Sequence, residues 1–336
     1  MLKLRMLLLL IGYVLILTAC GKASQEDVVD KAHEKWNDTK GYEIEATMEV
    51  RTGAEPRTYD VVVWHTKPDF YRVTVKEQGE DVTQMIVRNE EGVFVVTPAL
   101  QKSYKFQSDW PKGNSQAYLI GGLAEDLKED KTATMTEQED AYLFEVATRN
   151  HEKTALPIEQ IEINKKTMLP TRVSLLNEAL EEKVVVTFNE VKLGTKRQAS
   201  EYAVEKFSEK EEKLATTADI VQKDFSTYYP TLNWTHTKLV DEKNLLADNN
   251  ETKRVILTFE GEKPFTLFQQ PALTTKSVVP VMSPGDLADL GDTIGAITDH
   301  SISWEKDGIS FFIASTQLSR EEMIEVAMTV SVGSEK

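Results

Sequence analysis

Hydrophobic and polar residues alternate strictly along the segment GYEIEATMEVRT, residues 41–52. Every second residue from Tyr42 to Val50 is apolar, and the residues between them are charged or threonine. A period of two predicts a β-strand with one buried and one exposed face. Short apolar segments follow without helices between them, each bounded by turn residues: RTYDVVVWH, DFYRVTVKE, DVTQMIVRN, GVFVVTP and KSYKFQ. This spacing predicts an antiparallel meander.

Two segments in this part of the chain have a helical pattern instead. Residues 24–39, which Ser24 can cap, place four apolar residues on one helical face: Val28, Val29, Ala32 and Trp36. The second segment, NSQAYLIGGLAEDL at residues 114–127, contains the pair Gly121-Gly122, which weakens a helix. We therefore expect it to be a movable cover. Strands resume after it in four segments: AYLFEVATR, LPIEQIEINK, PTRVSLLNE and KVVVTFNEV.

The alternation stops near Gly194, where a charged segment without periodicity begins. After it we predict a helix at residues 217–228, a strand near LNWTHTKLVD, and two strand pairs: RVILTFEG with PFTLFQQP, and SISWE with ISFFIAS. A last helix should begin at Ser319, because Glu322 completes a capping box. The predicted fold class is α+β, with an antiparallel N-terminal unit and a smaller C-terminal α+β unit.

The only cysteine, Cys20, follows an apolar run of about twelve residues that begins after Lys3 and Arg5. A helix that spans a bilayer needs about 20 residues, so this run suits a signal peptide better. The sequence LTACG resembles the lipobox of bacterial lipoproteins, in which the cysteine is diacylated, palmitate being an expected chain, and becomes the first residue. We predict a signal peptide at residues 1–19 and a lipidated tether at 20–24. The alternative is an uncleaved anchor helix with a free thiol.

The net charge limits the partners of the chain. The 336 residues carry a formal charge of −16, and cleavage before Cys20 removes two positive residues and no acidic one, which leaves −18. Such acidity argues against nucleic acid and against an anionic bilayer as electrostatic partners. We expect a protein anchored by its lipid on the extracytoplasmic face of the cell membrane. With one cysteine, its stability must come from a hydrophobic core.

The sequence contains no recognisable catalytic or metal-binding motif. The five histidines are scattered, and the sequence has no zinc, P-loop, dinucleotide or serine-hydrolase signature. Asp286, Asp289 and Asp292 recur every three residues, but the other oxygen ligands of a calcium loop are missing. We predict no enzyme activity, no metal and no cofactor. A hydrolase would require several carboxylates, or a histidine and a serine, to meet in a cleft.

Several segments together resemble the LolA/RseB superfamily. They are VVVWHTKPDFYRVTV, the hairpin QMIVRNEEGVFVVTPALQKSYKF, the helix SQAYLIGGLAEDL and the later hairpin LPIEQIEINKKTMLPTRVSLLNE. The resemblance covers about residues 25–207 and implies an unclosed antiparallel half-barrel with helices over an apolar cavity. It leaves residues 208–216 as a linker and 217–336 as the C-terminal domain.

The superfamily carries lipoprotein acyl chains or senses stray lipoproteins, so the resemblance implies an acyl chain or a lipidated partner as ligand. Lys67 has the position of the carrier's basic residue before proline, which holds the lid helix. The carrier has arginine there, and lysine offers a compact charge in place of a planar fork. The residues that we predict to line the cavity are Ile44, Met48, Trp64, Tyr71, Val73, Met85, Phe94 and Tyr118.

The whole chain also resembles a lipoprotein family associated with sporulation in endospore-forming Gram-positive bacteria. The C-terminal unit ends in that family's pattern with Trp304, Gly308, Phe311, Ile313, Leu318, Ser319, Glu321 and Glu322. Two hypotheses follow. In the first, the half-barrel binds an acyl chain or lipidated partner. In the second, the chain is an interaction or sensing module for an envelope or sporulation protein, with no ligand. Composition alone favours an ordinary packed core. A roomy cavity under residues 115–127 would favour the first hypothesis, and a filled core the second.

Overall fold

The computed structural model describes residues 23–52, 56–79, 83–100, 102–106, 109–111, 116–149, 156–204, 225–231, 237–246, 253–272 and 280–332. Within these residues the N-terminal unit is one twelve-stranded sheet in the order β16-β6-β5-β4-β3-β2-β1-β11-β10-β9-β8-β7. The strands are β1 (Gly41–Val50), β2 (Arg57–Thr66), β3 (Phe70–Glu77), β4 (Thr83–Asn89), β5 (Gly92–Thr97), β6 (Lys102–Phe106), β7 (Thr134–Glu137), β8 (Ala141–Ala147), β9 (Ile158–Asn164), β10 (Pro170–Leu176), β11 (Glu182–Leu193) and β16 (Val281–Met282).

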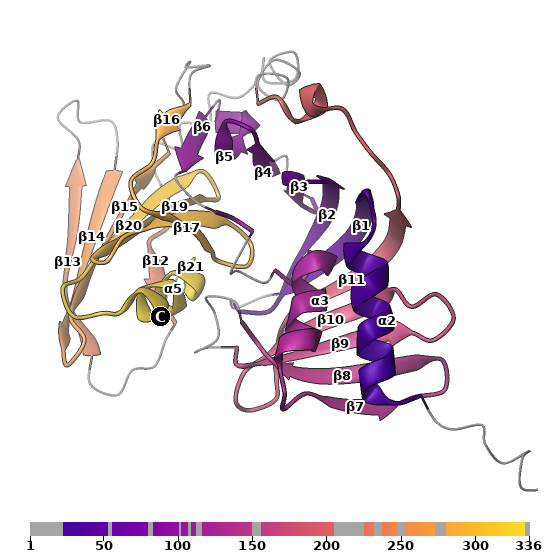
Figure 1. Ribbon diagram of the computed structural model, residues 1–336. Coiled ribbons are helices and arrows are strands. Elements are labelled where there is room, and N and C mark those ends of the chain that lie inside the picture. The colour runs from indigo at the N-terminus through magenta and orange to yellow at the C-terminus, as the bar shows by residue number, and fades with distance from the viewer. Residues whose placement is uncertain are drawn as a thin grey trace, which may run out of the picture.

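The sheet curves into a half-barrel (Figure 1). The half-barrel is open because, among the described strands, its two edge strands, β7 and β16, do not pair with each other. Neighbouring strands are antiparallel except β16, which pairs with β6 in parallel. The alternation in β1 has the predicted effect: Tyr42, Ile44, Ala46, Met48 and Val50 are all buried. The open half-barrel and the α+β class are therefore as predicted.

Two helices fill one end of the concave face. Helix α2 (Gln25–Asn37) begins as predicted, with the Ser24 Oγ accepting a hydrogen bond from the Asp27 amide at 3.1 Å. It buries the four predicted residues of its apolar face: Val28, Val29, Ala32 and Trp36. Helix α3 (Ile120–Glu129) packs beside it against the same sheet. The helix begins at Ile120, later than the predicted segment 114–127. Tyr118 and Leu119 therefore lie before the helix and not within it.

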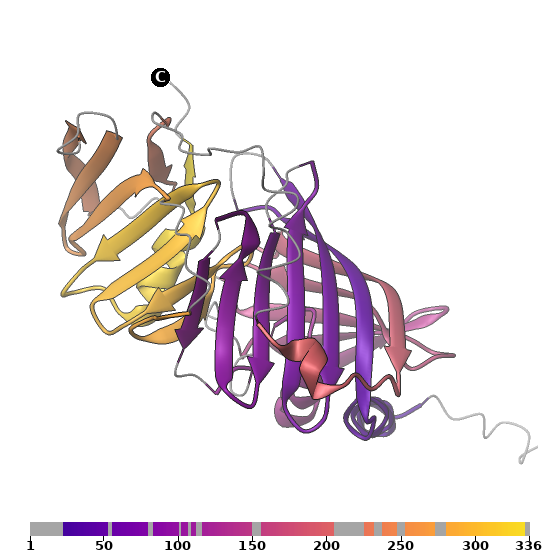
Figure 2. The ribbon, with the colours of Figure 1, turned by 90° about the horizontal axis from the view of Figure 1, so that it is seen from above.

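The convex face carries a second, smaller apolar cluster. After β11 the chain crosses to this face and forms the short 3-10 helix η2 (Ala199–Tyr202), as Figure 2 shows. Tyr202 and Val204 of this strap pack against apolar side chains of β4 and β5: Met85, Val87, Phe94 and Val96. The Tyr202 hydroxyl lies 2.9 Å from Thr66 Oγ1, which fixes the strap to the end of β2.

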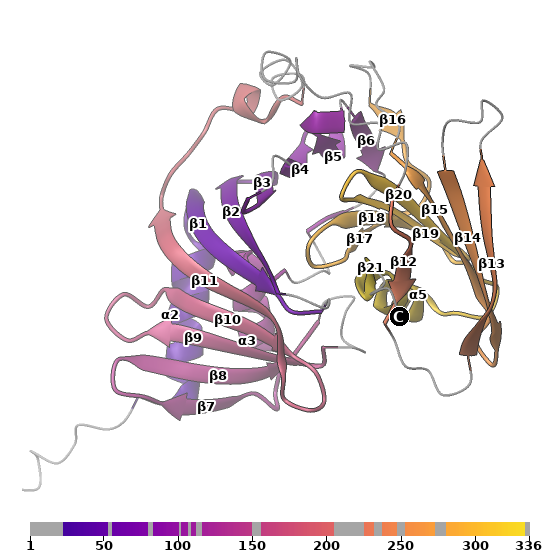
Figure 3. The same ribbon diagram turned by 180° about the vertical axis from the view of Figure 1, so that it is seen from behind.

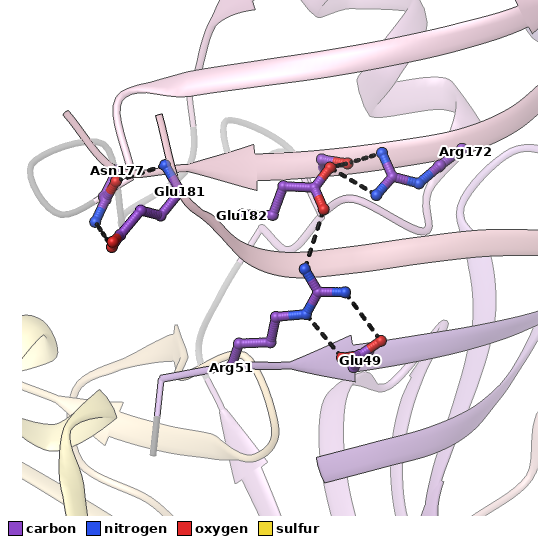
Figure 4. Close-up of polar contacts among 7 residues, drawn as sticks. Glu49, Arg51, Arg172, Asn177, Glu181 and Glu182 are labelled. Atoms are coloured by element: carbon purple, nitrogen blue, oxygen red, sulfur yellow. Dashed lines mark hydrogen bonds and ion pairs between the residues drawn. The ribbon is translucent and has the colours of Figure 1, made fainter. Parts of the chain in front are cut away.

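A network of charged side chains lies at one rim of the half-barrel, where β1, β11 and β10 meet (Figure 4). The Arg51 guanidinium donates to both oxygens of Glu49, at 2.7 and 3.2 Å, and to Glu182 at 3.0 Å. Arg172 donates to the other oxygen of Glu182 at 2.6 Å. These hydrogen bonds from guanidinium groups lower the pKa of Glu49, and those from Arg172 and Ser174 outweigh desolvation to lower that of Glu182.

The C-terminal unit is built around a seven-stranded antiparallel sheet in the described residues, in the order β13-β14-β15-β20-β19-β18-β17. Its strands are β13 (Thr237–Leu246), β14 (Lys253–Gly261), β15 (Phe265–Pro271), β17 (Asp286–Asp289), β18 (Ile294–Ile297), β19 (Ser301–Lys306) and β20 (Ile309–Ala314). One face packs on helix α5 (Arg320–Met328), next to the small pair β12 (Tyr228–Pro230) and β21 (Val330–Val332). Figure 3 shows this unit beside the open end of the half-barrel.

Two local predictions for this unit have different outcomes. Helix α5 has the predicted capping box, in which the Ser319 Oγ accepts from the Glu322 amide and the Glu322 carboxylate accepts from the Ser319 amide. The predicted helix at 217–228 is wrong at its end, because Tyr228 begins strand β12 and pairs with Val332. The remainder of that helix, residues 217–224, lies outside the described residues, as does the predicted linker at 208–216.

Candidate functional site

A pocket of about 450 Å³ lies between the half-barrel and the C-terminal sheet. One wall is the concave face of β4, β5 and β6, beyond the part that the helices cover. The other wall is the face of β15, β18, β19 and β20 that points away from α5. Ligand pockets of proteins have volumes of roughly 300–1,000 Å³. The space between the two units is therefore large enough for a small ligand.

Both walls of the pocket contain aromatic side chains. Tyr104 and Phe106 come from β6, while Phe268 and Phe312 lie opposite one another on β15 and β20. Phe312 is the most open of these, with 42% of its surface exposed. Behind it, Trp304 stacks on Phe311 with ring centroids 5.0 Å apart and an interplanar angle of 11°. Rigid aromatic walls can bury an apolar ligand at little cost in side-chain entropy.

A buried ion pair joins the two units at the side of the pocket. The Lys102 ammonium of β6 donates to Oε1 of Glu305 in β19, and the two side chains are only 9% and 15% exposed. The same oxygen accepts a hydrogen bond from Ser310 at 3.0 Å and lies 3.5 Å from the Tyr104 hydroxyl. Burial and the nearby Glu305 carboxylate raise the pKa of Tyr104, so its hydroxyl keeps its proton. The negative charge of Glu305 is thus balanced by the positive charge of Lys102.

A second group of contacts, which we call the clasp, holds the units together next to the pocket. The Arg57 guanidinium of β2 donates two hydrogen bonds to the Asp307 carboxylate, at 2.9 and 3.0 Å. Asp292 accepts from the Tyr59 hydroxyl at 3.1 Å and pairs with Lys306 at 2.6 Å. Asp307 belongs to the turn between β19 and β20, where Asp307 and Gly308 both have positive φ, 53° and 72°. The turn therefore presents the carboxylate to the half-barrel.

Five of the eight predicted cavity residues belong to the core on the concave side. Ile44, Met48, Val73 and Tyr118 are buried, and Tyr71 packs against them, half-buried. The space that touches Met48 and Tyr118 measures about 20 Å³, which is the scale of a single water molecule. The apolar residues of α3 and its approach fill the rest: Leu119, Ile120, Leu123, Ala124 and Leu127. Among the described residues, this space is too small for an acyl chain.

The other three predicted cavity residues lie on the opposite face of the sheet. Met85 and Phe94 belong to the convex cluster beneath the strap, and Trp64 packs at its edge. The Trp64 ring lies between two guanidinium groups, 3.5 Å from Arg197 and 4.3 Å from Arg72. The structure therefore does not bring these three residues together with the other five.

Lys67 lies near both helices but contacts the end of α2. Its ammonium donates to the carbonyl of Asn37, the last residue of α2. The Asn37 side chain in turn donates to Glu125 of α3 at 2.9 Å. A cation at a helix C-terminus also interacts favourably with the helix dipole. Lys67 thus reaches the predicted lid only through Asn37.

The remaining predictions concern residues with other surroundings or outside the described ranges. Cys20, its signal peptide and its tether up to residue 22 lie outside them. The three aspartates of residues 286–292 have different partners: Asp286 pairs with Arg320 at 2.6 Å, Asp289 accepts from the Gly291 amide at 2.9 Å, and Asp292 belongs to the clasp. In the described part of the chain, no three His, Cys, Asp or Glu side chains are arranged to hold a metal ion. The described helices include none with the length and apolarity needed to cross a membrane.

The pocket residues were not among the predicted site residues, although the sequence contains a signal for them. In SFFIA the apolar residues Phe311 and Ile313 occupy one face of a strand, and Phe312 occupies the other. The segment FTLFQ has the same arrangement, with Phe268 opposite the face of its buried neighbours. A strand with aromatic residues on both faces indicates that something covers its second face.

The fold and the pocket define the class of this protein: an α+β protein in which an open antiparallel half-barrel under two helices is docked to a second, smaller unit. The chain is 38% identical over 328 residues to "Sporulation protein YdcC" of Bacillus subtilis (strain 168), which covers 96% of this chain and 95% of that protein. The chain belongs to the family of that protein, as the sequence predicts. No protein-family model matches the chain.

Solved structures resemble the chain only distantly. MucB covers 92% of this chain and 98% of its own, with 12% identity and a TM-score of 0.37. A LolA superfamily protein from Nitrosomonas europaea covers 54% of this chain and 98% of its own, with 9% identity and a TM-score of 0.32. Both scores lie below 0.5, so these likenesses add nothing to what the strand order itself shows.

Proposed function

We propose that this chain is a non-catalytic binding protein of the cell envelope that acts in sporulation, tethered to the membrane by a lipid on Cys20. Its ligand is an acyl chain or a lipidated partner, bound between the two units. The observation that carries the proposal is the pocket of about 450 Å³ with aromatic walls, at the open end of the half-barrel. The tether would keep this pocket close to the bilayer and so raise the effective concentration of membrane ligands.

The name of the Bacillus subtilis relative supports the sporulation part of the proposal. The short apolar run and the lipobox-like LTACG support the anchor. Replacement of Cys20 by serine tests the anchor in the living cell. We expect the wild-type protein in the membrane fraction and the Cys20→Ser protein outside it. Equal membrane association of both proteins would contradict lipid anchoring.

Native mass spectrometry tests the binding part directly. A chain that begins at residue 20, with Cys20→Ser, keeps every residue that the structure describes. After gentle purification from a lipid-producing host, we expect an adduct of lipid mass. Phe312→Asp in the pocket should remove this adduct, because a carboxylate cannot be buried against an acyl chain. A clean protein mass, even after incubation with lipids and lipopeptides, would contradict the proposal.

The matched control is Val240→Asp. Val240 is also an exposed apolar residue of the C-terminal sheet, with 53% of its surface exposed, but it lies on the edge strand β13 and not at the pocket. Its replacement should leave the adduct in place. Loss of the adduct in both variants would mean that the mutations act on the fold or on non-specific lipid contact.

A second candidate function is an interaction or sensing module that holds no ligand. The filled core beneath α3 favours it, since the superfamily resemblance had placed an apolar cavity there. Chemical cross-linking in sporulating cells, followed by identification of the linked proteins, tests this candidate. A reproducible protein partner together with a ligand-free protein would favour it over the first.

A further inference from the structure

We propose that the pocket between the two units selects an uncharged amphiphile, with hydroxyl, ester or amide groups beside its acyl chain, over an anionic one such as a fatty acid or an anionic phospholipid. The proposal rests on the function proposed above and names the ligand class of the same site. Its basis is that the charged groups at the pocket are already paired with each other.

None of the described residues that line the pocket offers an unpaired positive charge to an anionic head group. Among the described lining residues, Glu305 is the only one with a charged side chain. Lys102, which pairs with that carboxylate, is itself buried. An anion that enters the pocket would lose its water and meet a carboxylate, whereas Lys102 is already paired with that carboxylate. Burial of an unpaired charge is strongly unfavourable.

The charges next to the pocket are paired as well. In the clasp, Arg57 binds Asp307 and Lys306 binds Asp292. An incoming anion would have to break one of these pairs and leave a partly or fully buried carboxylate without its partner. The net charge of −18 predicted for the mature chain adds a general repulsion of anions.

The uncharged polar groups of the pocket suit a different head group. The lining contains the side chains of Gln84, Thr97, Gln270, Ser283 and Ser303. Amides and hydroxyls both donate and accept hydrogen bonds, so they can match hydroxyl, ester and amide groups without a desolvated charge. Together with the aromatic walls, they describe a site for an acyl chain that carries a neutral polar head.

Two lipids with the same acyl chain test the proposal: monododecanoylglycerol, which is uncharged, and dodecanoate, measured at pH 8 below their micellar concentrations. The protein is the Cys20→Ser chain from residue 20, and the measurement is the dissociation constant by calorimetry. We expect dodecanoate to bind at least about tenfold more weakly than monododecanoylglycerol, because its carboxylate would lose its water without gaining a charge-assisted hydrogen bond. Such a hydrogen bond is worth roughly tenfold or more in affinity.

Glu305→Gln should remove the selection. The substitution leaves Lys102 as a buried cation beside the pocket, so dodecanoate should gain at least about tenfold in affinity. The affinity for monododecanoylglycerol should change by less than about threefold. The double variant Lys102→Met with Glu305→Met removes both charges and replaces the pair with apolar side chains, which is often neutral for stability. It should keep the affinity for the neutral lipid without a gain for dodecanoate.

The possible outcomes separate this inference from the proposed function. If neither lipid binds the wild-type protein, the proposed function fails and this inference fails with it. If both lipids bind equally well, the inference is overturned and the proposed function stands. The wild-type comparison decides this even if Glu305→Gln does not fold. A folded Glu305→Gln protein without a gain for dodecanoate would also overturn the role assigned to the ion pair.

Discussion

The concave face of the half-barrel is filled at one end and open at the other. Under α2 and α3, side chains of the helices and of β1, β2, β10 and β11 form one close-packed core. At β4 to β6 the helices no longer reach the sheet, and the C-terminal sheet stands opposite it, with about 450 Å³ left between them. The same concave surface thus serves as a core where its own helices cover it. It becomes a candidate binding wall where a separate unit covers it.

The largest expected effect belongs to the filled end. Leu123→Ala removes a fully buried side chain from α3, at 0% exposure in the core. We expect the free energy of unfolding to fall by about 2–5 kcal/mol, because the lost burial and the new cavity both destabilise the folded state. Denaturant-induced unfolding measures this change.

A fall of less than about 1 kcal/mol in the free energy of unfolding would contradict a filled core at this end. Truncation of a leucine in a close-packed site costs more than that. It would indicate that α3 covers a loose space, as a lid over a cavity would. The first sequence-based hypothesis, with the ligand beneath this helix, would then regain its place.

A pH-dependent effect should also arise at the filled end. Glu159 of β9 is buried beside Asp126 of α3, with exposures of 2% and 0%. Burial and then the hydrogen-bonded Asp126 carboxylate raise the pKa of Glu159 well above its usual value. The folded protein therefore keeps a proton on Glu159 that the unfolded chain releases above about pH 4.3.

The sign follows from proton linkage. The contribution of this group to stability is complete below the unfolded pKa and is lost as the pH rises towards the folded pKa. The free energy of unfolding should fall by up to about 1.4 kcal/mol per pH unit in that interval. Glu159→Gln, which cannot ionise, should flatten this slope and be the more stable protein at pH 8. Urea unfolding between pH 5 and 8 measures both proteins, and parallel slopes would rule out the buried proton.

A smaller effect is expected from the clasp that holds the open end together. Arg57→Ala removes two hydrogen bonds to Asp307 between the units. We expect a loss of about 1–3 kcal/mol in the free energy of unfolding. We also expect weaker binding of monododecanoylglycerol, because the clasp would no longer hold the two walls of the pocket at a fixed distance from each other.

Arg51→Ala is the matched control, since Arg51 makes a similar two-pronged contact with Glu49 inside the half-barrel. It should lower stability without changing lipid affinity. If both variants bind lipid like the wild-type protein, the docking of the two units does not shape the site.

The sequence predicted best those elements whose two faces differ in polarity. Strand β1 alternates without exception, and both α2 and α5 begin at the predicted serine. In these elements the local sequence pattern is sufficient to predict the structure, because only one face is buried and the pattern identifies that face. The open half-barrel came from the order of such segments and from family resemblance.

The faces of β4 and β5 were harder to predict. Met85, Ile86 and Val87 are consecutive and all buried, as are Val93 to Val96. Both faces of these strands are covered, one by the concave core and one by the strap, so alternation cannot tell which residues point inward. For this reason the sequence pattern predicts Met85 and Phe94 in the cavity, although they lie on the convex side. The pocket itself joins residues near 84–106 to residues near 268–312, and no local pattern contains that pairing.

The smallest expected effect on stability lies at the rim of the pocket. Phe312→Ser replaces an aromatic side chain that is 42% exposed, so the free energy of unfolding should change by less than about 0.5 kcal/mol. An aromatic contact is worth about 0.5–1.5 kcal/mol, which predicts a loss of about twofold to tenfold in affinity for monododecanoylglycerol. Leu239→Ser, at a site 40% exposed on the edge strand β13, should change neither quantity. A stability loss without a change in affinity would make Phe312 a packing residue. The space between the units would then be a gap left by docking, and both ends of the half-barrel would serve the fold alone.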